Sequence, residues 1–259
     1  MHAWAVRVLA VTLLLPAVAR GQVASEVNQQ YQFWGSVNST IRLTGRFGAI
    51  ADVHVRRNDF LADPSFYFLR FAANYWATER LTLAVGYAHA WYAPTCDGCE
   101  TWSGENRVYE QLIYVTRIGR ATMVQRLRSE QRFRESVVND VATGGTTFTN
   151  RVRYLASFTV PFSDNPKRPA LALADEIAVQ FGPRVVYNTF EQNRLFVGVR
   201  QALSRSWSFD LGYMLVYQQL ATGYQYDLNH TLRFWFYFTP DLRKHGKEKP
   251  AAHHASVDE

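Results

Sequence analysis

The sequence predicts an all-β protein: a single closed antiparallel transmembrane β-barrel of about twelve strands, with ten strands as the alternative. Three observations support this prediction. Apolar and polar residues alternate in long runs, short and long connections separate the runs, and no segment after the N-terminal stretch holds some twenty consecutive apolar residues. Alternation places successive side chains on opposite faces of a strand, as the wall of a barrel requires.

The N-terminal stretch has the order of a secretory signal peptide. Met1 to Arg7 carries a positive side chain, Val8 to Val18 is apolar, and small residues follow around Ala19. The apolar run of about eleven residues is too short to span a bilayer as a helix. We therefore predict a cleaved signal peptide; a buried N-terminal helix is the alternative.

These features divide the chain into three segments. The signal peptide is predicted for residues 1–21 and the outer-membrane β-barrel domain for residues 22–240. Residues 241–259 are charged, lack an apolar pattern and are predicted to be a disordered polar tail.

Eleven runs alternate clearly. In the last run, Leu232, Phe234 and Phe236 share one face, and Arg233 and Trp235 share the other. Most runs are longer than the five to six residues of an average globular strand. Thirteen residues at a tilt near 40° rise roughly 33 Å, enough to cross a bilayer. The predicted strands are 29–43, 46–57, 66–77, 81–92, 105–118, 121–135, 148–161, 170–182, 189–202, 206–218 and 228–239.

The count of eleven raises a problem of parity. An odd number of strands leaves the two chain ends on opposite sides, whereas bacterial barrels normally have an even count. Either one strand is missed or wrongly split, or the segment from Val23 to Gln30 passes through the lumen. Twelve strands is the prediction.

The connections differ in length on the two sides of the predicted sheet. Tight turns are expected at 44–46, 78–80, 119–120 and 203–205, and longer links at 58–65, 93–104, 136–147, 183–188 and 219–227. Outer-membrane barrels have short turns on one side and long loops outside the cell. The link from Pro161 to Pro169 is an exception, because it is long and lies on the short side.

The basic composition does not indicate a nucleic-acid partner. The formal net charge is +6 and the pI about 9.4, but most basic residues lie singly at alternate positions rather than in a patch. No nucleic acid is expected.

Two cysteines, Cys96 and Cys99, lie in a predicted long loop. A single CxxC supplies half of a usual zinc site, and no βαβ pattern of a redox protein surrounds it. We predict a disulfide between them, with redox activity or metal binding as alternatives. No metal and no cofactor are expected.

The polar face of the predicted strands is rich in arginine. Arg126, Arg128, Glu130 and Arg132 alternate in one run, so their side chains face the same way. Charged side chains cannot face hydrocarbon at low cost, which assigns this face to the lumen. The candidate lumen-lining residues are Arg107, Gln111, Arg126, Arg128, Glu130, Arg132, Arg151, Arg153, Glu176, Gln192, Arg194 and Arg200.

Two interpretations of this face remain open. It can form a basic constriction that selects anions or binds an acidic ligand. It can instead form an internal salt-bridge network, in which Glu130, Glu176, Asp52 and Asp210 balance arginines and fill a narrow interior. The excess of arginine over acid favours the first interpretation, and the narrowness of such a barrel favours the second.

Aromatic residues near strand ends predict girdles at the two lipid–water interfaces. They are Trp91, Tyr92, Trp207, Tyr217 and Phe238. The alternative is the core of a soluble β protein.

A lipid-hydrolysing enzyme on the same scaffold would need a nucleophile and a histidine base. His89 and Ser129 both fall on the lipid-facing parity, but nothing in the sequence pairs them and no GxSxG motif is present. No catalytic residue is therefore predicted.

Several motifs together resemble one family. They are Glu105-Asn106-Arg107 with Tyr109 and Gln111, Arg126-Leu127-Arg128 with Glu130 and Arg132-Phe133, Arg151-Val152-Arg153-Tyr154, Asp175-Glu176, Phe190 with Gln192-Asn193-Arg194-Leu195, and Gly212-Tyr213-Met214. In order and spacing they resemble the uncharacterised bacterial outer-membrane β-barrel proteins grouped as domain of unknown function 2490, over roughly residues 28–239. The resemblance implies a barrel and an outer-membrane location but no reaction. The loop of Cys96 and Cys99 and the polar tail depart from it.

From these observations we expect a monomeric outer-membrane barrel that acts as a narrow pore or a ligand-binding barrel with an arginine-rich lumen. Its expected partners are outer-membrane lipid, the barrel-assembly machinery during biogenesis, and an anionic solute or ligand. A lipid-modifying enzyme and a soluble periplasmic binding barrel are the alternatives.

Overall fold

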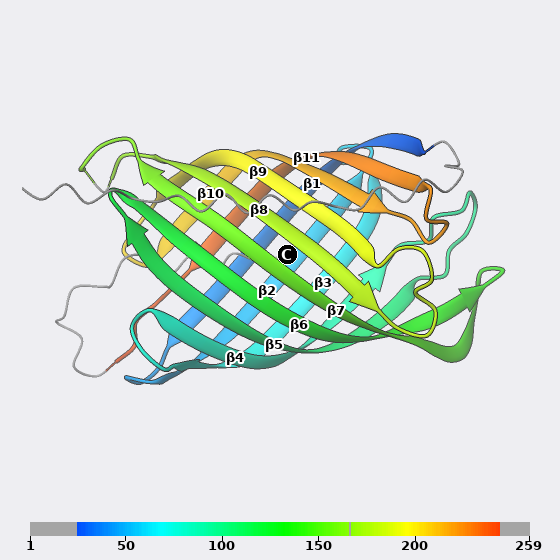
Figure 1. Cartoon of the computed structure of the whole chain (residues 1–259), viewed down its shortest axis with the longest axis horizontal. Helices are drawn as coiled ribbons and strands as arrows, with labels where there is room; N and C mark the ends of the chain where they lie inside the picture. Colours follow the sequence, from blue (N-terminus) through cyan, green and yellow to red (C-terminus); the bar gives the residue numbers. More distant parts are fainter. Residues whose placement is uncertain (1–24, 166, 244–259) are drawn as a thin grey trace, which may run out of the picture.

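The computed structural model describes residues 25–165 and 167–243, which form one closed β-barrel (Figure 1). Each of the eleven predicted runs overlaps one strand of its wall. The strands are β1 (Glu26–Arg42), β2 (Phe47–Asn58), β3 (Asp63–Trp76), β4 (Leu81–Tyr92), β5 (Ser103–Ile118), β6 (Ala121–Val138), β7 (Val141–Pro161), β8 (Ala170–Phe181), β9 (Phe190–Ala202), β10 (Trp207–Gln219) and β11 (Gln225–Phe238). The predicted signal peptide at 1–21 and residues 244–259 of the predicted tail lie outside the described residues. No helix in the described ranges is long and apolar enough to cross a membrane.

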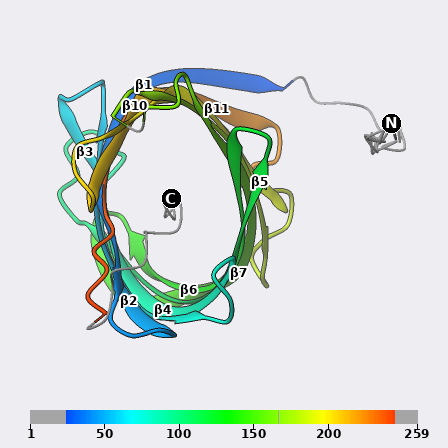
Figure 2. The same cartoon turned by 90° about the vertical axis from the view of Figure 1, so that its left-hand side faces the viewer.

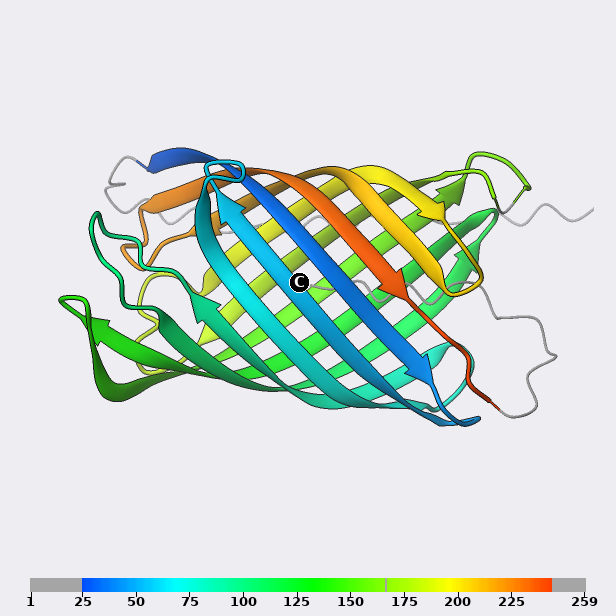
Figure 3. The same ribbon diagram turned by 180° about the vertical axis from the view of Figure 1, so that it is seen from behind.

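The barrel closes through one parallel pair of strands. The ring follows chain order with antiparallel neighbours, and β1 completes it against β11 (Figure 2). This pairing runs from Glu26 beside Gln225 to Ser39 beside Phe238, and the two arrows point the same way in Figure 3. When successive strands alternate in direction and their number is odd, the first and the last strand run in the same direction. They can therefore pair with each other only in parallel. The closed all-β barrel is confirmed. The expectations of twelve strands and of wholly antiparallel pairing are corrected, because the parallel pair closes a wall of eleven described strands.

The start of the described chain also belongs to the wall. Glu26 to Gln30 extend β1 and pair with Gln225 to Asn229 of β11. These residues therefore do not pass through the lumen, which was one of the options for resolving the odd count.

Each strand sorts its side chains between two faces. In β11, Asn229, Thr231, Arg233, Trp235 and Tyr237 are buried inside the ring, and the residues between them are more exposed on its outer surface. This is the period-two geometry of an extended chain. The outer surface is consequently rich in large apolar side chains and the interior in charged ones.

The two ends of the barrel differ. We call the end formed by the links 43–46, 77–80, 119–120, 162–169 and 203–206 the turn end. The opposite end, formed by the links 59–62, 93–102, 139–140, 182–189 and 220–224, is the loop end. The link 162–169 is the long exception at the turn end that the sequence predicted.

One predicted loop is largely strand. Residues 136–147 were expected to be a long link, but β6 continues to Val138 and β7 begins at Val141. Only Asn139 and Asp140 lie between them, both with positive φ (50° and 59°). Asn and Asp tolerate this conformation better than other residues, and a two-residue turn of this kind matches the twist of a hairpin. The hairpin projects beyond its neighbours at the right of Figure 1.

Candidate functional site

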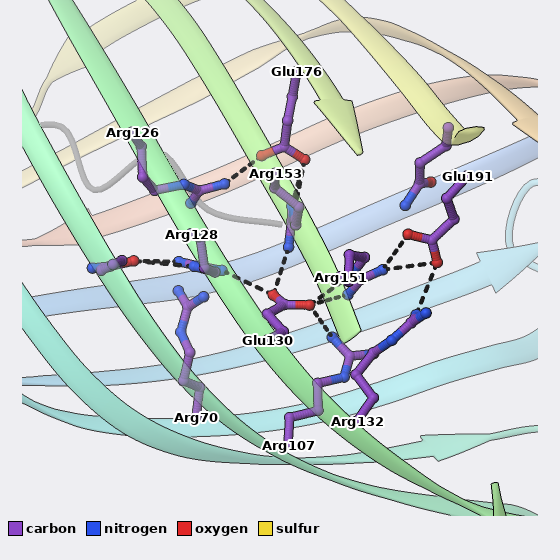
Figure 4. A network of polar contacts seen from close by, with 12 residues as sticks. Arg70, Arg107, Arg126, Arg128, Glu130, Arg132, Arg151, Arg153, Glu176 and Glu191 are labelled. Atoms are coloured by element: carbon purple, nitrogen blue, oxygen red, sulfur yellow. Dashed lines mark hydrogen bonds and ion pairs between the residues drawn. The ribbon is translucent and has the colours of Figure 1, made fainter. Parts of the chain in front are cut away.

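An arginine–carboxylate network lies on the inner face of β5 to β9 (Figure 4). Its carboxylates are Glu130 on β6, Glu176 on β8 and Glu191 on β9, and its arginines come from β5, β6, β7 and β9. Alternation along neighbouring strands of the same wall directs these side chains inward, except that of Glu191, which lies at a register shift between β8 and β9. Within this network we call the groups around each carboxylate its cluster.

The cluster of Glu130 gathers four arginines around one carboxylate. Arg151 donates from Nε to Oε2 at 2.6 Å and Arg153 from Nη1 to Oε1 at 3.1 Å. Arg128 Nη1 lies 3.7 Å from Oε1 and Arg107 Nη1 lies 4.0 Å from Oε2. Glu130 thus ties β5, β6 and β7 together through one buried charge.

The cluster of Glu176 shares Arg153 with the first. Arg153 donates to Glu176 Oε1 from Nε at 3.0 Å, Arg194 Nη1 lies 3.4 Å from the same oxygen, and Arg126 donates to Oε2. Because Arg153 contacts both carboxylates, the two clusters form one continuous network along the inner face of β5 to β9.

The third carboxylate, Glu191, was missed from the sequence. Its parity placed it on the outer face, beside the inward Gln192. A register shift lies at this point, where Ala178 pairs with Gln192 and Val179 pairs with Phe190. The extra residue turns Glu191 inward, where its Oε1 accepts from Arg132 at 2.8 Å and from Arg151 at 3.2 Å. A bulge re-aims a side chain in this way, and no pattern of alternation announces it.

A separate cluster surrounds Asp210 on β10. Arg200 holds it with two bonds, from Nε to Oδ1 at 2.6 Å and from Nη2 to Oδ2 at 2.7 Å. Tyr237 donates to Oδ2 at 3.0 Å and Arg233 at 3.2 Å. The guanidinium of Arg233 also lies 3.6 Å from the ring centroids of Phe196 and Trp235. Arginine here is held by aromatic faces as well as by carboxylate oxygens.

The buried side chains carry an excess of positive charge. Among the described residues ten arginines are buried, namely Arg42, Arg70, Arg107, Arg126, Arg128, Arg132, Arg151, Arg153, Arg194 and Arg233. Five carboxylates are buried with them: Asp52, Glu105, Glu130, Glu176 and Asp210. Since buried charges are tolerated when paired and hydrogen-bonded, the sharing of Glu130, Glu176 and Asp210 among several arginines explains how the interior holds this excess.

Two cavities lie at the ends of the barrel. The loop-end cavity has a volume of about 910 Å³, and Glu105, Arg132 and Glu191 lie at its inner limit. The turn-end cavity has a volume of about 450 Å³, and Arg200 lines it. The two cavities share no lining residue, and the network lies between them.

All twelve candidate lumen residues have side chains directed into the barrel. Eleven are buried, and the side chain of Arg200 is 12 % exposed. Gln111 accepts from Arg128 at 2.7 Å and Gln192 from Arg194 at 3.4 Å. The structure brings eleven of the twelve into the clusters of Glu130, Glu176 and Glu191 or onto their arginines, and Arg200 into the cluster of Asp210. Arg107 additionally contacts Glu105 at 2.5 Å.

Four of the five residues predicted for the aromatic girdle face outward. Trp207 stacks on Phe238 at the turn end with ring centroids 4.5 Å apart, and Trp91 and Tyr217 face outward near the loop end. Tyr92 is corrected. Its hydroxyl accepts from Arg107 at 2.7 Å inside the barrel, because it follows the outward Trp91 by one residue.

The structure joins Cys96 to Cys99 by a disulfide in the link 93–102. Asp140 of the β6–β7 hairpin holds this link, because its carboxylate accepts from the backbone N–H groups of Glu100 at 3.1 Å and Thr101 at 2.7 Å. These bonds hold the pKa of Asp140 below its usual value.

The two residues considered for lipid hydrolysis do not meet. His89 Nδ1 lies 2.7 Å from Asn106 Oδ1, whereas Ser129 accepts from Gln131 at 3.1 Å. Within the described ranges no group of three or more His, Cys, Asp or Glu side chains is placed to hold a metal ion.

Comparison with known proteins places this geometry in a family. No curated protein and no solved structure matches the chain. One family model does, described as a protein of unknown function (DUF2490), and it matches residues 31–229. That range begins in β1, ends in β11 and includes every residue of the Glu130, Glu176, Glu191 and Asp210 clusters except Arg233 and Tyr237. The chain belongs to the DUF2490 family of proteins of unknown function.

Proposed function

We propose that this chain is an outer-membrane β-barrel whose lumen is closed at mid-height, and that it binds a small polar ligand in the loop-end cavity. The observation that carries the proposal is the network between the two cavities. A pore needs a continuous aqueous path, and here the clusters of Glu130 and Glu176 join the inner faces of the consecutive strands β5 to β9, while the guanidinium of Arg194 on β9 reaches the ring of Trp34 on β1 at 5.1 Å. The proposal includes no catalytic step.

The outer surface supports a membrane location. Large apolar side chains are exposed along most strands, and Phe71, Val85 and Leu195 lie near strand centres. The shortest strands have twelve residues, a rise of roughly 30 Å at the tilt of a barrel. Aromatic pairs lie near both ends, as membrane interfaces favour.

Polar groups on the outer surface are concentrated on β5 to β9, and several are paired with one another. Asn193 donates to Asp175 at 2.6 Å, and Gln131 donates to Glu110 at 3.3 Å. Hydrogen bonds between such groups lower the free-energy cost of placing them against hydrocarbon. This part of the wall is therefore compatible with a lipid environment.

The loop-end cavity suits a polar ligand with both charges. Arg132, Arg134 and Arg184 line it together with four carboxylates, Glu105, Glu135, Asp140 and Glu191. Its volume lies within the range of about 300–1,000 Å³ typical of small-molecule sites. A zwitterion such as an amino acid could pair with both signs of charge there.

Two measurements test the barrel part of the proposal. The refolded full-length chain should migrate differently on a gel before and after boiling, and in planar bilayers it should give no steady conductance. Replacing Arg126 and Arg128 by serine should create conductance, because it removes part of the network. Steady anion-selective conductance of the unaltered protein would show instead that the barrel is a pore, and unchanged gel migration would support a soluble barrel.

Ligand binding needs a separate experiment. Saturation-transfer NMR with a panel of free amino acids, on the refolded chain in detergent micelles, should detect binding that weakens in Arg184→Ala and persists in Arg205→Ala. Arg184 lines the loop-end cavity, whereas Arg205 is exposed at the turn end. Absence of binding, or equal loss in both variants, would contradict the assignment of this cavity.

A further inference from the structure

The turn-end cavity is distinct from the ligand site proposed above. It lies under the β7–β8 link, from which Ser163, Asp164 and Arg168 contribute to its lining. Residues at the turn ends of β5, β6, β7, β8 and β9 form the rest of the lining. We propose that this cavity binds a phosphate monoester. The proposal does not depend on the loop-end site or on closure of the lumen.

The first support is that arginines outnumber carboxylates among the residues that line the cavity. Four arginines line the cavity: Arg117, Arg120, Arg168 and Arg200. Asp164 is the one carboxylate among the lining residues. The loop-end cavity, by contrast, has three arginines and four carboxylates. The excess of positive charge is therefore specific to the turn end, and it suits a dianion.

The second support is that two of these guanidinium groups have no other bond. In the described ranges the side chains of Arg117 and Arg168 make neither a hydrogen bond nor an ion pair within the chain. Arg117 ends the inward row of β5, and Arg168 comes from the link across the cavity. Their donors are available to a bound anion from two sides.

The other two arginines differ in rigidity. Arg200 is fixed by its two bonds to Asp210 and by a bond from Nη1 to Thr159 Oγ1 at 3.3 Å, so it forms a preorganised part of the cavity wall. Arg120 contacts Asp164 at 2.9 Å, but their side chains are 60 % and 98 % exposed. Such an exposed pair contributes little, so a phosphate can replace Asp164 as the partner of Arg120.

The rest of the lining determines the organic part of the ligand. Val124, Pro161, Ala170 and Ala202 give the cavity an apolar wall beside its charged one. A volume of about 450 Å³ exceeds what inorganic phosphate alone would fill. A phosphate carried on a short, partly apolar body matches both walls. That body can belong to a soluble metabolite or to a phospholipid.

The test is calorimetric titration of the refolded full-length chain in detergent micelles at low salt, with glycerol 3-phosphate as the soluble probe. A short-chain phosphatidic acid in mixed micelles is the lipid probe. We expect saturable binding that weakens at least tenfold in the double variant Arg117→Ala/Arg168→Ala. The matched control, Arg80→Ala/Arg205→Ala, removes two exposed turn-end arginines that do not line the cavity and should change affinity less than twofold.

The outcomes separate the two sources of phosphate and the failure of the idea. If glycerol 3-phosphate binds and its binding is lost in Arg117→Ala/Arg168→Ala but not in the control, the ligand is soluble. If phosphatidic acid shows this pattern and glycerol 3-phosphate does not bind, the ligand is a lipid. If neither probe binds, or if both double variants weaken binding equally, the site is refuted. Heat-modifiable gel migration of each variant shows that the barrel has folded.

Discussion

The membrane location can be tested at one residue of the outer wall. Val53 lies at the middle of β2, beside Val37 of β1 and Leu69 of β3. Its exposed fraction is 48 %, and no carboxylate lies on the outer face near it. Replacing it by arginine places a charge at mid-height with no counter-ion within reach. The change in the free energy of unfolding therefore reports on what surrounds the barrel at Val53 rather than on contacts inside the barrel.

The expected magnitude depends on what surrounds Val53. In a bilayer an arginine at the midplane of a barrel destabilises it by about 2–4 kcal/mol. Such a change multiplies the unfolding equilibrium constant by roughly 30 to 700. In water an exposed surface substitution usually changes stability by about 0.5 kcal/mol or less. The two environments therefore predict effects that do not overlap.

The control is chosen to match exposure. Leu43, in the link 43–46, has an exposed fraction of 50 % but lies at the turn end, outside the strands. Leu43→Arg should therefore cost no more than about 1 kcal/mol in either environment. Comparing the two variants removes the general effect of adding an arginine.

The assay is reversible urea unfolding of each variant in phospholipid vesicles, followed by tryptophan fluorescence. The expected order of stability is wild type and Leu43→Arg together, with Val53→Arg lower by about 2–4 kcal/mol. If Val53→Arg stays within about 0.5 kcal/mol of the control, the outer wall does not face hydrocarbon and the membrane proposal fails.

Four further predictions concern the interior and the loop end. Glu130→Gln should lower the free energy of unfolding by about 3–5 kcal/mol, because it leaves buried arginines without their shared carboxylate. Urea unfolding measures this change, and a loss below about 1 kcal/mol would contradict the role of the network. Asp140→Gly keeps the positive φ of this position but removes the carboxylate, so the backbone amides of the link 93–102 should exchange hydrogen faster at pH 7. Unchanged protection of these amides would show that Asp140 does not hold the link. Because the pKa of Asp140 is lowered, its carboxylate stabilises the link 93–102 of the unaltered protein at neutral pH, and this stabilisation should be lost as pH falls below 3.8. Protection factors of the link, corrected for intrinsic exchange, should then decrease. Replacing Cys96 and Cys99 by serine should lower the free energy of unfolding by no more than about 2 kcal/mol, because the disulfide closes a short ring outside the wall. A larger loss in urea unfolding would show that the disulfide stabilises the barrel itself.

Much of the wall and its inner face was predictable because side-chain direction in a strand has a period of two. Arg126, Arg128, Glu130 and Arg132 needed only their spacing to be assigned to one face. Their exclusion from the outer face then followed from the cost of placing charge in hydrocarbon. The number of runs was also visible, although the expectation of an even count led to a different total.

The features that sequence could not predict depend on pairing between strands. Glu191 turns inward because β8 and β9 shift register, and a single strand carries no record of its partner's register. The β6–β7 hairpin extends to Val138 because its two strands continue to pair beyond the ends of their neighbours. The parallel pairing of β1 and β11 joins residues nearly two hundred positions apart, as in the pair Ser39 and Phe238.

The composition of the interior follows from how arginine is accommodated. One carboxylate can accept from several guanidinium groups, as Glu130 does, and aromatic faces can add to the hold of a shared acid, as Trp235 and Phe196 do for Arg233 beside Asp210. A barrel filled in this way needs fewer carboxylates than arginines, so a net positive charge is a consequence of the packing. Where the packing ends, at the turn-end cavity, that charge is no longer covered by side chains. An anion from solution or from lipid is the partner that completes it.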